Sequence, residues 1–80
     1  MKQVIIVRKN DKQLSLEEMQ SLVGGRIERH PKKVEIDGKS YDVIVNEEGI
    51  INGLPINKDM LDRFGITVCG NAILIEGGLI

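Results

Sequence analysis

Four consecutive β-branched residues, Val4 to Val7, stand close to the start of the chain. An uninterrupted run of this kind favours extended backbone and is typical of a strand that is covered on both faces. A second apolar run extends from Ala72 to Ile75. We expect the two runs to be neighbouring strands, with Val4 to Val7 in the interior of a sheet.

The segment after the first run carries signals for both ends of a short helix. Ser15 and Glu18 have the spacing of a capping box, in which each side chain accepts a hydrogen bond from the other residue's backbone. Apolar residues recur at helical spacing from Leu16 to Val23, and Gly24-Gly25 supplies the left-handed residue that ends a helix. The sequence therefore predicts a helix that begins after Ser15.

The middle of the chain has the pattern of a β-hairpin. Asp37-Gly38 is a favoured pair for a tight turn, and it separates Val34 to Ile36 from a returning strand at Tyr41 to Val45. Arg26 to His30 can be extended as well, until Pro31 interrupts it.

A second short helix is predicted between Asn57, which can cap it, and Gly65, which can close it. Met60, Leu61 and Phe64 would face the core. Ile66 to Val68 and the final apolar run then form the last strands, or one bent strand.

This order of elements predicts an α+β fold in a single domain, residues 1–80, with a mostly antiparallel sheet and two short helices on one face. A chain of 80 residues buries only about 60% of the surface that its unfolded form exposes, so its core is thin. Two short helices would leave part of the sheet open. We therefore expect a homodimer, formed through the terminal strands or through the open face.

Composition excludes several classes of function. Eleven Lys and Arg residues against twelve Asp and Glu give a net charge of -1, so we do not expect a nucleic-acid-binding protein. The single cysteine, Cys69, cannot form an internal disulfide, as is typical of a reduced, cytoplasmic protein. The N-terminal apolar run is too short for a signal peptide or a membrane span, so no membrane association is expected.

The segment from Asn46 to Asn57 is the predicted binding loop. Asn46, Glu47 and Glu48 form an acidic turn at its start, and Asn57 stands at its end. Loops on a rigid scaffold carry many binding residues, and adjacent glutamates suit an electropositive partner. The alternative is a structural connector whose composition reflects turn chemistry alone. The spacing of the oxygen ligands matches no calcium loop, so no metal is predicted.

A second, basic patch is predicted around Arg26 and Arg29, which could bind phosphate or an acidic partner. His30 and Cys69 are the one pair that suggests nucleophilic catalysis, but no motif marks either as activated. These two ligands are also fewer than the four of a structural zinc site. We therefore expect no catalytic residues, no cofactor and no enzymatic activity.

Several short motifs in order resemble a known family. They are Leu22-Val23-Gly24-Gly25, Val45-Asn46-Glu47-Glu48-Gly49 and Gly53-Leu54-Pro55-Ile56-Asn57, followed by Gly70 before an apolar strand. The chain is similar to a small domain of unknown function found in phages and conjugative elements of Gram-positive bacteria. The resemblance implies a mobile-element accessory protein in the host cytoplasm, which inhibits or modulates a host protein such as a defence component.

The alternative is an oligomeric sponge. Such a protein would trap a small nucleotide-like signalling molecule between subunits, with Arg26, Arg29 or Arg63 on its phosphates.

Overall fold

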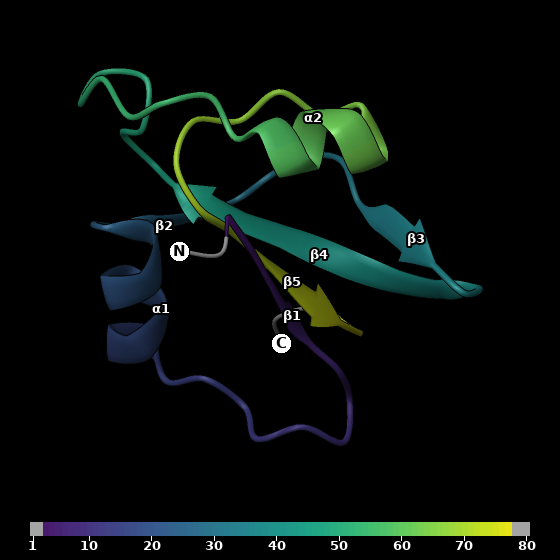
Figure 1. Ribbon diagram of the computed structural model, residues 1–80. Helices are drawn as coiled ribbons and strands as arrows, with labels where there is room; N and C mark the ends of the chain where they lie inside the picture. The colour runs from purple at the N-terminus through teal and green to yellow at the C-terminus, as the bar shows by residue number, and fades with distance from the viewer. Residues whose placement is uncertain (1–2, 78–80) are drawn as a thin grey trace.

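The computed structural model describes residues 3–77, which form a five-stranded mixed sheet with a helix on each face (Figure 1). The strands are β1 (Val4–Val7), β2 (Ile27–Arg29), β3 (Val34–Ile36), β4 (Lys39–Asn46) and β5 (Ala72–Glu76). The helices are α1 (Leu16–Val23) and α2 (Lys58–Phe64). The predicted α+β class is confirmed. Within the described residues neither helix has the length and apolar character that a bilayer span requires.

The strand order is β1-β5-β4-β2, and β3 pairs with β4 on the same side as β2. Only β1 and β5 run parallel, so the mostly antiparallel sheet was predicted correctly. The terminal strands are neighbours, as expected, with Val4 opposite Ala72. The prediction of an interior position for β1 was wrong, because β1 ends the order. An apolar run indicates that both faces of a strand are covered, but it does not indicate which strands form the edges of the sheet.

The two helices lie on opposite faces of the sheet, so the prediction that both pack on one face was wrong. Alternate residues of β4 and β5 point to opposite sides. Met60 of α2 packs with Val43 and Leu74 on one face. Leu61 was expected to face the core as well, but it is 43% exposed. Met19 of α1 packs with Ile44 on the other face. Because the central strands are apolar on both sides, each face needs its own cover.

The predicted ends of α1 are confirmed. The Ser15 hydroxyl oxygen accepts a hydrogen bond from the Glu18 N–H at 3.1 Å, and the Glu18 carboxylate accepts one from the Ser15 N–H at 3.0 Å. The hydrogen bond from the Ser15 backbone lowers the pKa of Glu18. This carboxylate therefore stabilises α1 above its ordinary pKa, and the contribution is lost as the pH falls through the lowered value. Gly24 ends the helix with φ of 83°.

Other local predictions have mixed outcomes. Asp37 and Gly38 both have positive φ, 51° and 78°, as a tight primed turn requires. Ile66 to Val68 was expected to be a strand and is irregular instead. Ile66 and Val68 are nevertheless buried, on the same face of the sheet as α2. They help α2, which has only seven residues, to cover that face.

Asn57 caps α2 and joins it to the sheet. Its side-chain oxygen accepts a hydrogen bond from the Met60 N–H at 3.0 Å, as the capping prediction required. Its side-chain NH₂ donates to the carbonyl oxygens of Gln3 at 2.8 Å and Gly70 at 2.9 Å. The side chain is fully buried. One residue therefore fixes the start of α2 against the segments that lead into β1 and β5.

We predict that Asn57→Ala lowers the free energy of unfolding by about 2–3 kcal/mol, because it removes a helix cap and the amide group that donates to the carbonyl oxygens of Gln3 and Gly70. Urea unfolding followed by circular dichroism measures the change. Lys58→Ala is the matched control, since Lys58 is exposed and should change stability by about 0.5 kcal/mol or less. Equal stability of the two variants would contradict this role for Asn57.

Candidate functional site

The connection from β4 to α2 begins at a buried asparagine. The Asn46 side-chain oxygen accepts a hydrogen bond from the Glu48 N–H at 2.7 Å, which forms a turn. Its NH₂ group donates to the Val23 carbonyl oxygen at 3.1 Å, at the end of α1. The Glu47 N–H donates to the Arg26 carbonyl oxygen at 2.8 Å. The start of the connection is thus fixed to α1 and to the residue before β2.

Residues 47–54, called the 47–54 loop below, are ordered by their own backbone. The Asn52 N–H donates to the Glu48 carbonyl oxygen at 2.8 Å, and the Leu54 N–H donates to the Gly49 carbonyl oxygen at 3.0 Å. Gly49 lies so close to the segment before β5 that an added Cβ would be 2.7 Å from the Cys69 carbonyl oxygen. Only glycine permits this approach without a backbone shift.

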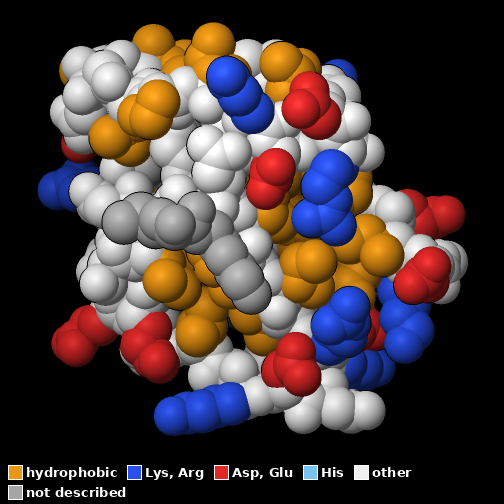
Figure 2. All heavy atoms as spheres, viewed as in Figure 1, with side chains coloured by type: hydrophobic (Ala, Val, Ile, Leu, Met, Phe, Trp, Pro, Cys, Tyr) orange, Lys and Arg blue, Asp and Glu red, His pale blue; other side chains and the backbone are white. Residues whose placement is uncertain are grey.

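Two isoleucines project from the 47–54 loop into solvent. Ile50 is 83% exposed and Ile51 is 81% exposed, the largest values among the exposed large hydrophobic residues. The loop extends away from the sheet at the upper left of Figure 1, and hydrophobic side chains gather at the same place in Figure 2. Scattered exposed apolar residues are common, but two adjacent ones on an ordered turn form a patch that a partner could cover.

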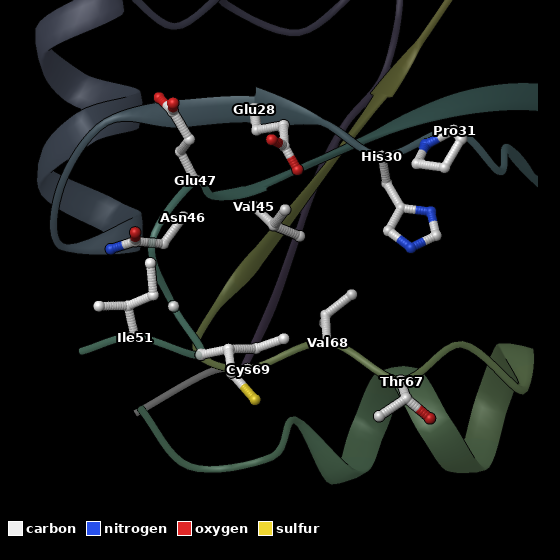
Figure 3. Close-up of a pocket in the computed structure, with 12 residues that line it drawn as sticks. Glu28, His30, Pro31, Val45, Asn46, Glu47, Ile51, Thr67, Val68 and Cys69 are labelled. Carbon is white, nitrogen blue, oxygen red and sulfur yellow. The ribbon is translucent and has the colours of Figure 1, made fainter. Parts of the chain in front are cut away.

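A pocket of about 490 Å³ lies beside the 47–54 loop, at the edge of the sheet formed by β2. We call it the β2-edge pocket. Its walls come from β2 and the residues after it, from the end of β4, from the 47–54 loop, and from residues 67–69. Val45 and Val68 point toward each other across it (Figure 3). Its interior is thus apolar, and Ile50 and Ile51 are part of its lining.

The polar residues that line the β2-edge pocket are His30, Asn46, Thr67 and two glutamates. Glu28 and Glu47 both line it, and Glu48 is exposed next to Glu47 on the loop. Among the residues that line the pocket there is no Lys or Arg. Within residues 3–77 neither Glu47 nor Glu48 forms a salt bridge. The site therefore joins an apolar surface to uncompensated negative charge, which suits a partner that is apolar and basic.

The structure separates the six predicted site residues. Glu47 and Glu48 are exposed on the loop, whereas Asn46 and Asn57 are buried and bonded within the fold. The side chain of Asn57 is therefore not accessible to a partner. Arg26 is exposed, and Arg29 lies 3.7 Å from the carboxylate of Asp42.

The basic patch does not converge on the β2-edge pocket. Arg29 is directly opposite Ile44, so its side chain leaves the sheet on the face that α1 covers. Lys33 also pairs with Asp42, at 3.6 Å. These cations are thus held around one nearly buried aspartate on the other face of the sheet.

His30 and Cys69 line the same pocket, but their arrangement does not suggest a nucleophile and its base. The His30 Nδ1 accepts a hydrogen bond from the Lys32 N–H at 3.1 Å, so this nitrogen is occupied. The sulfur of Cys69 is directed away from the His30 ring (Figure 3). Within the described part of the chain, no three His, Cys, Asp or Glu residues are grouped as a metal site would require.

Sequence reasoning overlooked the most exposed hydrophobic residues of the site. Ile50 and Ile51 stand between Gly49 and the turn at Asn52-Gly53, which leaves too few residues for a buried strand. That spacing was the available signal for exposure. The contribution of Thr67, Val68 and Cys69 to the pocket had no local signal, because it depends on a contact between distant segments.

The model of one protein family matches residues 1–78, and the chain therefore belongs to the family described as Domain of unknown function (DUF3846). No curated protein and no solved structure matches the chain.

Proposed function

We propose that this member of the family is a non-enzymatic binding protein that recognises another protein through the 47–54 loop and the β2-edge pocket. The observation that carries the proposal is the pair Ile50 and Ile51, which are almost fully exposed on a turn held by backbone hydrogen bonds. An ordered loop loses little conformational entropy on binding, so apolar area buried there contributes efficiently to affinity.

The chemistry of the site supports a partner with both apolar and basic groups. Burying one isoleucine contributes about 1.5–3 kcal/mol, so Ile50 and Ile51 can act as anchors of an interface. Glu28, Glu47 and Glu48 lie beside them and favour an electropositive surface. The proposed partner therefore presents an apolar side chain to the β2-edge pocket and Lys or Arg residues to its rim.

The motif resemblance supplies the biological context of the proposal. A protein of a phage or conjugative element acts in the host cytoplasm, where it meets host proteins at the surface it displays. We propose that the partner is a host protein, such as a component of a defence system, and that binding inhibits or modulates it.

The nucleotide sponge is supported less well. Arg29 is paired with Asp42, and the Arg63 guanidinium lies over the Phe64 ring at 5.1 Å from its centroid. The β2-edge pocket would bring acidic side chains, not cations, to a phosphate. Native mass spectrometry of the protein isolated from a host lysate separates the two functions: a retained protein supports the proposal, and a retained nucleotide supports the sponge.

Ile50→Ser combined with Ile51→Ser should weaken binding to the captured partner about a hundredfold, because two anchor side chains lose their buried area. Isothermal titration calorimetry with purified proteins measures the change in Kd. Leu16→Ser is the control, since Leu16 is 55% exposed on α1, away from the loop. The proposal fails if the double variant binds normally, or if Leu16→Ser weakens binding as strongly.

Glu47→Ala combined with Glu48→Ala tests the charge of the rim. Because both glutamates are exposed, the free energy of unfolding should change by about 0.5 kcal/mol or less. Association with a basic partner should slow, and its rate should depend less on salt concentration. Stopped-flow kinetics measures both effects.

Glu35→Ala combined with Asp62→Ala removes the same charge from exposed positions outside the site. This control should keep most of the salt dependence. If the two double variants behave alike, only the net charge matters. If Glu47→Ala with Glu48→Ala keeps full affinity and the native rates, these glutamates are not part of the binding site.

A further inference from the structure

The edge of the sheet formed by β1 is open within residues 3–77. β5 is the one strand that pairs with β1 in this part of the chain. The Ala72 N–H donates to the Gln3 carbonyl oxygen at 2.8 Å, so the backbone of Gln3 faces β5. Because backbone groups alternate in direction along a strand, the N–H and C=O groups of Val4 and Ile6 point away from β5. Within residues 3–77 no backbone hydrogen bond occupies these groups, so they can pair with a further strand.

The four residues of β1 lack three of the features that usually prevent strand addition. Natural proteins protect edge strands with proline, a bulge or an inward-pointing charge. β1 consists of Val4, Ile5, Ile6 and Val7, and it pairs with β5 in continuous register. Its sequence and geometry therefore favour pairing.

A groove of about 490 Å³ runs beside this edge, between β1 and α2. Its lining residues are Val4, Ile5, Ile6, Arg8, Asp59 and Arg63. In Figure 2, apolar side chains near the centre of the view are flanked by acidic and basic side chains, over the region where Figure 1 shows β1 and α2. An added strand would thus meet apolar and charged side chains.

The charges of this groove lie at opposite ends of β1. The Asp59 N–H donates to the Gln3 side-chain oxygen at 3.2 Å, which places Asp59 near the residue before β1. Arg8 directly follows β1. A second copy that runs antiparallel would bring its Asp59 to Arg8 of the first copy, and its Arg8 to Asp59 of the first.

We propose that a second copy of this chain pairs with the β1 edge, in antiparallel orientation, to form a twofold-symmetric dimer with one continuous sheet. Directly opposed residues in such a pair share a face of the sheet. Val4 and Ile6 are on the same face, so each pairs with the other in the second copy, and Ile5 lies on the twofold axis. This register forms roughly four backbone hydrogen bonds. The two α2 helices then lie side by side on one face.

Self-pairing suits this surface better than pairing with an unrelated peptide. The groove carries charges of both signs, and the twofold operation brings Arg8 of each copy to Asp59 of the other. The edge is also the remaining apolar surface of β1, because both faces of the sheet carry a helix. The dimer is independent of the proposed function, since the β2-edge pocket lies at the other end of the strand order.

Light scattering after size exclusion, from about 1 µM to 1 mM protein, tests the dimer together with hydrogen exchange followed by NMR. We expect a mass twice the 8.9 kDa of the chain at high concentration. The amide protons of Val4 and Ile6 should become protected as the dimer forms. A monomer at every concentration overturns the proposal, and so does a dimer in which these two amides exchange freely.

Charge exchange tests the register. Arg8→Asp alone and Asp59→Arg alone should each weaken the dimer about tenfold, because attraction becomes repulsion at two symmetric positions. The double variant should regain most of the loss. Asp62→Arg, on α2 outside the groove, is the matched control and should leave dimerisation unchanged. Failure of the double variant to recover would overturn the proposed register.

Discussion

The architecture depends on a central pair of strands that is sealed from water on both faces. Val43 and Ile44 of β4, and Ala72, Ile73 and Leu74 of β5, are all 0% exposed. Since neighbouring residues of a strand point to opposite faces, each face must be covered by its own helix. A chain of 80 residues has few residues left to cover a sheet, and the two helices leave its edges uncovered. The β2-edge pocket and the β1 edge are the surfaces that result.

Two buried asparagines hold the two ends of the connection from β4 to α2 in place. Asn46 attaches its start to α1, and Asn57 attaches its end to the segments before β1 and β5. Buried amides of this kind require complete hydrogen bonding, because each unpaired group would cost about 1–3 kcal/mol. Because both ends of the connection are fixed, the exposure of Ile50 and Ile51 results from the fold and not from a flexible loop. Both asparagines position the binding surface, and Asn46 also lines the β2-edge pocket.

The sequence predicted what depends on neighbouring residues. The capping box of Ser15 and Glu18, the turn at Asp37-Gly38 and the cap at Asn57 each involve contacts within a few positions. Apart from the exposure of Ile50 and Ile51, the site features that it missed depend on contacts between distant segments. The Asn57 amide bonds Gln3, 54 positions away, and the Asn46 amide bonds Val23, 23 positions away. Nothing local distinguishes such an asparagine from an exposed ligand, and nothing local assigns a helix to one face of a sheet.

The central claim is that the 47–54 loop is rigid in the free protein and displays Ile50 and Ile51 ready for binding. Measurement of ¹⁵N relaxation at these residues tests it most directly. The account predicts backbone order parameters of about 0.8 or higher, similar to those of β4, whereas values below about 0.6 from residue 48 to residue 53 would contradict it.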